Sequence, residues 1–202
     1  RGRGDRVSEH NADPEIRRSS MPLTEFLKFL RISDEEADAS AIRTSRNSSH
    51  ERIRLTTRLT EFQRILQEVD TSGHCQFDAI GKKVGKHYTD VRQDVGGWLQ
   101  KHPNFEFENN AKIRDFLQDI EWPTFCDEVS LSNASNPRWG CHLTLFAAAQ
   151  FYRRTIRVWS SRPGNEYWLE IMPHGQEVAC DEPIEIAHEF ERHYLSVELY
   201  QT

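Results

Sequence analysis

The spacing of apolar residues changes along the chain. In the middle of the sequence they recur every three or four positions, which is typical of helices with one buried face. In the last quarter they form short runs between turn residues, which favours strands. The pattern predicts helices over Glu51–Leu66 and Cys75–Val84, from Thr89 to just before His102, and over Ala111–Ile120 and Trp139–Tyr152, with strands over Thr155–Ser160, Tyr167–Met172, Ile184–Ala187 and Tyr194–Leu199. Trp122–Pro137 follows neither spacing and is predicted to be irregular.

This order of elements indicates the fold class and the domain organisation. Helices that precede a group of strands indicate an α+β or α/β domain with one small central β-sheet flanked by helices, which we place at residues 51–202. Residues 1–20 are charged and poor in apolar residues, so we expect a disordered tail. Residues 21–50 are predicted to be a short amphipathic helix, Pro22–Arg31, followed by a polar linker. That helix either packs on the domain or binds a partner.

Composition and charge exclude several classes of protein. The formal net charge is −6, whereas a nucleic-acid-binding domain normally carries a basic face. An acidic chain is compatible with a basic protein partner. No apolar run reaches the roughly 18 residues of a membrane span, so none is expected.

The four cysteines indicate the kind of compartment. Cys75, Cys126, Cys141 and Cys180 form no C-x-x-C pair and match no zinc-ligand spacing, so we expect no metal site. The chain is neither small nor dense in cysteine, and it shows no signal peptide, which favours reduced thiols in a cytoplasmic compartment over disulfides. The first residue is Arg1, and we interpret the sequence as a piece of a longer protein.

Cys75 is placed where cysteine chemistry is favoured. It follows a turn that contains Gly73 and begins a predicted helix with Phe77, Ile80 and Val84 on its buried face. The free N–H groups and partial positive charge of a helix N-terminus stabilise a thiolate and can also bind an oxyanion. We therefore predict that Cys75 is a nucleophile.

A nucleophilic cysteine requires a base, and the chain has nine histidines. Partners of this kind meet in space and not along the sequence. His193 opens the last predicted strand beside Tyr194, where a side chain can reach a neighbouring helix start, and it is the preferred base. His142 lies at another predicted helix start and is interpreted as a structural residue.

Four blocks of sequence resemble the ovarian-tumour (OTU) family of cysteine proteases. G-H-C-Q-F-D-A-I at Gly73–Ile80 resembles the family's D-G-N-C-Q-F-R-A-L block, and Asp90–Val95 resembles the V-R-x-x-V helix that follows it. Trp139–Ala149 is similar to W-G-D-H-x-T-L-x-A-A-A, and His193–Val197 is similar to H-Y-N-S-[IV]. The blocks occur in the family's order and cover most of the predicted domain.

The resemblance implies an α+β, papain-like fold and deubiquitinase activity, which is hydrolysis of the isopeptide bond at the C-terminus of ubiquitin. It assigns Cys75 as the nucleophile and His193 as the general base, with no cofactor. The oxyanion hole would be formed by the loop of Ser72, Gly73 and His74 that leads into Cys75.

The resemblance also implies residues that contact the substrate. Trp139 and Tyr194 are predicted to line the channel for the ubiquitin tail, although a place for Trp139 in the core is equally consistent with the sequence. The expected partner is ubiquitin or a polyubiquitin chain, with a second ubiquitin contact through residues 22–31.

The chain departs from the family pattern at several positions. Ser72 replaces an aspartate, His74 an asparagine and Cys141 an aspartate. Leu195 replaces the polar residue two positions after the catalytic histidine, and leucine cannot accept a hydrogen bond from an imidazole. The residue that orients His193 must therefore lie elsewhere; Asp70 is the first candidate and Glu198 the second.

These departures leave other functions open. The domain could be a ubiquitin-binding pseudoenzyme with a weakened or inactive site, or a protease for another ubiquitin-like modifier. A host enzyme and a microbial effector that acts in a host cytosol would have the same features.

Overall fold

The computed structural model describes residues 44–69, 73–107, 110–117, 120–131, 137–164, 166–175, 177–189 and 193–200. Within these ranges the chain forms five α-helices, one 3₁₀ helix and five strands. In chain order they are α2 (Thr44–Glu61), β1 (Arg64–Gln67), α3 (Cys75–Val84), α4 (Tyr88–Lys101), η2 (Ile113–Phe116), α5 (Trp122–Ser130), α6 (His142–Tyr152), β2 (Ile156–Ser160), β3 (Trp168–Ile171), β4 (Ile184–Glu189) and β5 (His193–Leu199).

The five strands form one mixed sheet in the order β1-β5-β4-β2-β3. Only the β2–β4 pair is parallel; the other three neighbouring pairs are antiparallel. The last strand, β5, lies between β1 and β4, so that Ser196 is opposite both Gln67 and Ile186. The sheet is therefore completed by the C-terminal strand.

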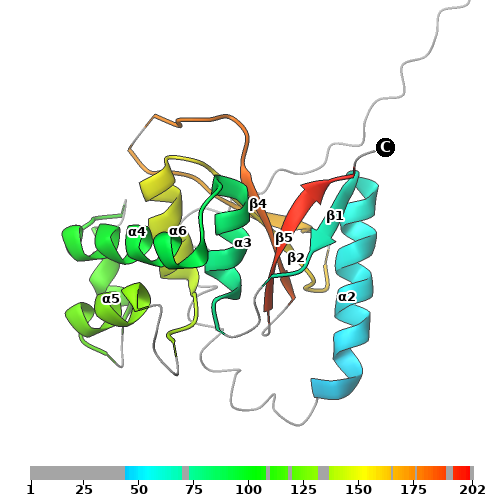
Figure 1. Cartoon of the computed structure of the whole chain (residues 1–202), viewed down its shortest axis with the longest axis horizontal. Helices are drawn as coiled ribbons and strands as arrows, with labels where there is room; N and C mark the ends of the chain where they lie inside the picture. The colour runs from blue at the N-terminus through cyan, green and yellow to red at the C-terminus, as the bar shows by residue number, and fades with distance from the viewer. Residues whose placement is uncertain are drawn as a thin grey trace, which may run out of the picture.

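The sheet separates two hydrophobic clusters. In Figure 1, α2 lies on one side of the sheet and the other labelled helices lie on the opposite side. The larger cluster joins α3, α4, α5 and α6 to side chains such as Ile184 and Ile186. The smaller cluster joins Leu55 and Leu59 of α2 to Ala187 and Leu195. Alternate residues of β4 therefore face opposite clusters, as the pleat of a strand requires.

The helix α6 packs tightly because it is rich in small residues. Ala147, Ala148 and Ala149 are all completely buried. Their methyl groups allow close approach of neighbouring elements at little cost in side-chain entropy. This segment lies at the centre of the larger cluster.

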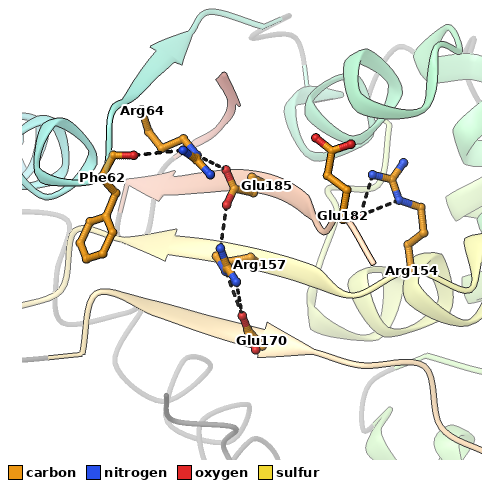
Figure 2. Close-up of polar contacts among 7 residues, drawn as sticks. All are labelled: Phe62, Arg64, Arg154, Arg157, Glu170, Glu182 and Glu185. Atoms are coloured by element: carbon orange, nitrogen blue, oxygen red, sulfur yellow. Dashed lines mark hydrogen bonds and ion pairs between the residues drawn. The ribbon is translucent and has the colours of Figure 1, made fainter. Parts of the chain in front are cut away.

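Four charged side chains form an ionic ladder across the face of the sheet that α2 partly covers (Figure 2). Arg64 Nε donates to Glu185 Oε2 at 2.6 Å, and Arg157 donates to Glu185 Oε1 at 2.8 Å and to Glu170 Oε1 at 2.6 Å. The side chain of Glu185 is 10% exposed. Two arginines and two glutamates alternate, so the charges of this ladder cancel.

The structure confirms the predicted fold class. The helix Cys75–Val84 has the predicted bounds and ends at Gly85, whose φ of 68° provides a left-handed C-cap. The expected strands are present, with small shifts: β4 extends to Glu189 and β5 begins at His193.

The prediction of one helix over Glu51–Leu66 was wrong at its end. The helix ends at Glu61, Gln63 takes a left-handed φ of 55°, and the chain continues as β1. Ile65 is 42% exposed whereas Leu66 packs in the smaller cluster, which is the alternation of a strand. The same helix begins at Thr44, inside the segment that we expected to be a linker.

Two further predictions were wrong between α4 and α6. Of the helix expected over Ala111–Ile120, the described residues contain only the 3₁₀ turn η2. The segment expected to be irregular contains α5, which has Pro123 in its first turn and buries Phe125 and Val129. A proline is tolerated in the first turn because its missing N–H would have no partner there.

Two predictions about the N-terminal region lie outside the described residues. These are the tail at residues 1–20 and the amphipathic helix Pro22–Arg31. Among the helices that are described, none has the length and apolar character required to cross a membrane.

Candidate active site

Cys75 is the first residue of α3, and its side chain is half-buried between the helix and the sheet. Gly73 and His74 lead into it, and the main chain of His74 accepts a hydrogen bond from Asp78 N at 2.9 Å, as the first carbonyl of the helix. The Cys75 thiol is therefore at a helix N-terminus, where the helix dipole favours a negative charge.

The same thiol reaches the beginning of β5. The backbone N–H of Tyr194 lies close enough to Cys75 to lower the pKa of the thiol, so the thiol is next to the residue that follows His193. Burial raises the pKa of the Cys75 thiol. Hydrogen bonds from the N–H groups of Tyr194, Gln76 and Cys75 itself, together with the positive charge of Arg92, act in the opposite direction. Because burial is the larger effect, formation of the thiolate depends on a base.

His193 is the first residue of β5 and its side chain is half-buried. It lies opposite Glu189 of β4 in the sheet. Its Nε2 atom is enclosed by protein and has no hydrogen-bond partner among the described residues. Within the described ranges Nε2 is therefore available to an acceptor that would orient the imidazole.

Leu195 does not supply that acceptor, as expected from its side chain. It is completely buried in the cluster under α2. Glu198 lies opposite Ile65 towards the other end of β5, roughly 16 Å along the strand from His193. This distance argues against Glu198 as the orienting residue. Asp70 and Ser72 lie outside the described residues.

Gly73 and Trp139 lie side by side next to Cys75. Gly73 has a φ of +88°, and a Cβ atom there would lie 3.0 Å from Pro137 Cγ and 3.3 Å from Trp139 Nε1. The Trp139 side chain is 65% exposed, so it is not a core residue. An exposed indole beside Gly73, two residues before Cys75, is suited to form the wall of a substrate channel.

Gln76 connects the three elements that meet at the site. Its Nε2 donates to Cys141 O at 3.2 Å and its Oε1 accepts from Thr144 Oγ1 at 2.5 Å. Its side chain also lies close enough to the Tyr194 hydroxyl to oppose the rise in the pKa of Tyr194 that burial causes. Gly140 passes so close that a Cβ there would lie 2.3 Å from Gln76 Oε1. The starts of α3 and α6 are thus tied to β5 by one buried amide.

Two other histidines adjoin the site on the sheet side. The ring of His188 stacks on Tyr194 with centroids 4.5 Å apart. Burial lowers the pKa of His188 to about 3 and that of His142 to about 4. Both imidazoles are therefore neutral at physiological pH, and neither can supply a positive charge to Cys75.

The sequence analysis missed Gln76 and Arg92. Arg92 is completely buried on the same face of α4 as Val95 and Leu99. The sequence did contain a signal for Arg92: it is a charged residue at a position where the helical spacing predicts an apolar one. An arginine is rarely buried without a specific set of acceptors.

Among the described residues, no group of three or more histidine, cysteine or carboxylate side chains is arranged to hold a metal ion. The arrangement is that of a thiol and an imidazole, which supports acyl transfer through a covalent intermediate.

Comparison with known proteins agrees with this geometry. The family model of the OTU-like cysteine proteases matches residues 70–197, a range that contains Cys75, Trp139 and His193. The chain is 31% identical over 133 residues to the OVARIAN TUMOR DOMAIN-containing deubiquitinating enzyme 10 of Arabidopsis thaliana. That match covers 64% of this chain and 33% of the plant protein, so the chain spans about a third of the length of this relative.

Solved structures show the same fold. The OTU domain of OTUD1 superposes with a TM-score of 0.59 at 15% identity, covering 75% of this chain and 96% of that domain. The viral OTU domain protease from Taggert virus gives a TM-score of 0.50 at 13% identity, covering 71% and 84% of the two chains. The chain belongs to the family of OTU-like cysteine proteases.

Proposed function

We propose that the chain is a deubiquitinase that hydrolyses the isopeptide bond at the C-terminus of ubiquitin, with Cys75 as nucleophile and His193 as general base. The observation that carries the proposal is the packing of α3, which begins with Cys75, against β5, which begins with His193, because it brings a helix N-terminal thiol to the strand that carries the imidazole. Family membership and the deubiquitinating relative from Arabidopsis support the choice of substrate.

In the proposed reaction His193 accepts the proton of the Cys75 thiol. The thiolate attacks the carbonyl carbon of the ubiquitin C-terminal glycine, and a C–S bond forms. The tetrahedral intermediate collapses with cleavage of the C–N bond, and His193 protonates the lysine amine that leaves. Water, deprotonated by the same imidazole, then hydrolyses the thioester and releases ubiquitin and the Cys75 thiol.

The oxyanion of the tetrahedral intermediate would be bound by N–H groups around Ser72, Gly73, His74 and Cys75. This assignment is supported by the position of Gly73 and His74 directly before α3. N–H donors fixed in advance stabilise the charge that develops in the transition state. Trp139 would contact the narrow tail of the substrate, whereas the side chain of Tyr194 is 8% exposed and packs in the larger cluster, which leaves it little surface for such a contact.

We assign Asp70 as the residue that orients His193. Gln67, the last residue of β1, lies opposite Ser196 in the described sheet. Asp70 follows Gln67 by three positions, and His193 precedes Ser196 by three positions. In an antiparallel pair, this equal spacing supports Asp70 as the residue that faces the start of β5. A carboxylate is also the strongest acceptor for an imidazole N–H.

The experiment is intact-mass analysis after incubation with a ubiquitin whose C-terminus carries a cysteine-trapping warhead. We expect an adduct with the wild-type chain, none with Cys75→Ala, and a much slower reaction with His193→Ala. The absence of an adduct on the wild-type chain, with ubiquitin still bound, would favour the pseudoenzyme. Probes built on other ubiquitin-like modifiers test the substrate: a faster reaction with one of these would contradict the assignment of ubiquitin.

We propose a second ubiquitin contact through residues 22–31. Leu23, Phe26, Leu27 and Leu30 would form one apolar face if the segment is helical. Removal of residues 1–43 would then slow cleavage of ubiquitin chains more than cleavage of a single ubiquitin with a fluorogenic C-terminal group. Equal effects on both substrates would contradict this contact.

The proposed compartment is a reducing one, the cytoplasm of the source cell or of a host. All four cysteines are free thiols in the structure. The nucleophile must also remain reduced to react. Rapid loss of activity in the absence of a thiol reductant, restored by adding one, is the expected behaviour.

A further inference from the structure

Arg92 of α4 donates hydrogen bonds to the segment before Cys75, to the segment before Trp139 and to α5. Its Nε donates to His74 Nδ1 at 2.9 Å, one terminal nitrogen donates to Val129 O at 3.0 Å, and the other donates to Gly73 O and Arg138 O, both at 2.9 Å. The side chain is completely buried. A buried guanidinium with four good acceptors is fixed in a single position.

Three of these four acceptors belong to two segments at the candidate site, and the fourth, Val129 O, belongs to α5. Gly73 and His74 directly precede the nucleophile, and Arg138 directly precedes Trp139. One planar side chain therefore fixes the segment that supplies oxyanion-binding N–H groups and the segment that carries the channel wall. Its position also determines the distance between them.

The charge of Arg92 is not cancelled by its contacts. None of its acceptors in the described part of the chain is a carboxylate, and the guanidinium carbon lies 4.0 Å from the centroid of the Phe77 ring. Burial lowers the pKa of Arg92 only to about 10, so the group stays protonated at neutral pH. Its positive charge acts on Cys75, where it opposes the effect of burial on the thiol pKa.

We propose that Arg92 is a positioning residue for acyl transfer: it fixes the Gly73–His74 segment against the Arg138–Trp139 segment, and its uncompensated charge favours the Cys75 thiolate and the anionic tetrahedral intermediate. This inference rests on the proposed function for its effect on turnover. Its effect on the thiolate does not depend on ubiquitin.

His74 is part of the same arrangement. Because Nδ1 accepts the hydrogen bond from Arg92, the ring proton of neutral His74 is on Nε2. The imidazole is 6% exposed and stacks on Tyr88 with centroids 4.3 Å apart and planes inclined by 17°. The residue before the nucleophile is thus fixed both by Arg92 and by an aromatic ring.

The test separates the charge of Arg92 from its hydrogen bonds with two variants. Arg92→Met removes both, and Arg92→Lys keeps the charge but cannot reproduce the planar set of donors. Arg157→Met is the matched control, because Arg157 also donates to several acceptors but lies in the ionic ladder under the other face of the sheet. Circular dichroism and thermal melting establish that each variant is folded at the assay temperature.

The first readout is the pH dependence of Cys75 alkylation by iodoacetamide, followed by mass spectrometry of the peptide that contains Cys75. We expect Arg92→Met to move the midpoint upward by about one pH unit, while Arg92→Lys stays near the wild-type midpoint. An unchanged midpoint in Arg92→Met would overturn the proposed effect of the charge.

The second readout is the split between kcat and KM on ubiquitin with a fluorogenic C-terminal amide. We expect kcat to fall roughly 100-fold in Arg92→Met and roughly 10-fold in Arg92→Lys, with KM changed less than about threefold, as for loss of an interaction made in the transition state. An equal fall in kcat for Arg157→Met would mean that any lost arginine has this effect, and it would overturn positioning by Arg92.

The two proposals fail in different ways. If Cys75→Ala retains full turnover, the proposed function is wrong, while the alkylation experiment still tests Arg92. If Cys75→Ala is inactive but Arg92→Met keeps wild-type kcat and midpoint, the proposed function stands and the inference about Arg92 is wrong. Where Arg92→Met is unfolded, the kcat of Arg92→Lys decides: a wild-type value would overturn the positioning role.

Discussion

Two arrangements of arginine lie on opposite sides of the sheet and differ in their partners. In the ionic ladder, Arg64 and Arg157 donate to Glu185 and Glu170, and the four charges cancel (Figure 2). On the other side, among the helices, Arg92 donates to carbonyl groups and an imidazole, and none of its acceptors in the described ranges is a carboxylate. The comparison shows that burial of an arginine does not by itself identify its role. A charge without a counter-charge, located beside the nucleophile, is suited to chemistry, whereas a paired charge is suited to stability.

The largest effect expected from this comparison is that of His193→Ala. Loss of the general base should lower kcat/KM by about 10³-fold, with little change in the melting temperature because the imidazole is half-buried and its Nε2 has no partner within the described residues. Steady-state kinetics and a thermal melt measure the two quantities. A large loss of stability without loss of kcat would mean that His193, like the residues of the ionic ladder, stabilises the fold and takes no part in the reaction.

Asp70→Asn should have the next largest effect. An amide in place of the carboxylate removes a charged acceptor for the imidazole, and we expect kcat to fall by about 10- to 100-fold. Glu189→Gln is the matched control, because Glu189 lies opposite His193 but accepts a hydrogen bond from Arg52 at 2.8 Å. Should Glu189→Gln lower kcat more than Asp70→Asn, the orienting carboxylate would be on β4.

Glu185→Gln should change stability and leave kcat/KM intact. Glu185 is the acceptor for both Arg64 and Arg157, and its side chain is 10% exposed. Loss of the carboxylate leaves two cations without their shared partner, which should lower the free energy of unfolding by about 2–3 kcal/mol. Urea denaturation measures this change, and Glu170→Gln, at 19% exposure and with one arginine partner, is expected to cost less. A tenfold fall in kcat/KM for Glu185→Gln would show that the two faces are coupled.

The last expected effect does not involve a substitution: it is a dependence of stability on pH. The pKa values of His188 and His142 in the folded chain, about 3 and about 4, lie below the ordinary value. The unfolded chain therefore binds these protons first, and the free energy of unfolding should fall as the pH drops from about 6.5 to about 4, by about 1.4 kcal/mol per pH unit for each histidine.

His188→Phe tests this assignment because phenylalanine keeps the stacking on Tyr194 and cannot titrate. Urea denaturation at pH 6 and at pH 5 gives the change in the free energy of unfolding between these two pH values. In His188→Phe, the part of this change that comes from His188 and His142 should be about half of its wild-type size. The same slope in His188→Phe as in the wild-type chain would contradict a buried neutral His188.

Much of the fold followed from local patterns, and the exceptions have physical reasons. The helix at Cys75–Val84 was predictable because its apolar spacing and Gly85 agree. The strand β1 was not, because Ile65 and Leu66 continue the apolar spacing of α2, and only the left-handed Gln63 separates the two elements. A left-handed conformation at glutamine has no signal in the sequence.

The candidate site also contains residues that local patterns indicate and residues that they do not. Cys75 and His193 could be proposed from a helix start, a strand start and the blocks that surround them, and the structure places them on adjoining elements. Arg92 and Gln76 could not be assigned a role, because their acceptors come from segments far apart in the sequence. Arg92 joins Gly73 to Arg138, and Gln76 joins α3 to α6. Contacts of this kind are set by tertiary packing and not by periodicity.

The position of β5 inside the sheet has a consequence for the timing of folding. Because β5 pairs with both β1 and β4 and begins with His193, the chain must be synthesised almost to residue 199 before β1 gains its partner in the described sheet and Cys75 gains its proposed base. Until then Cys75 belongs to a helix without its neighbouring strand. Under the proposed mechanism we therefore expect a nascent chain to be catalytically silent until the sheet is complete.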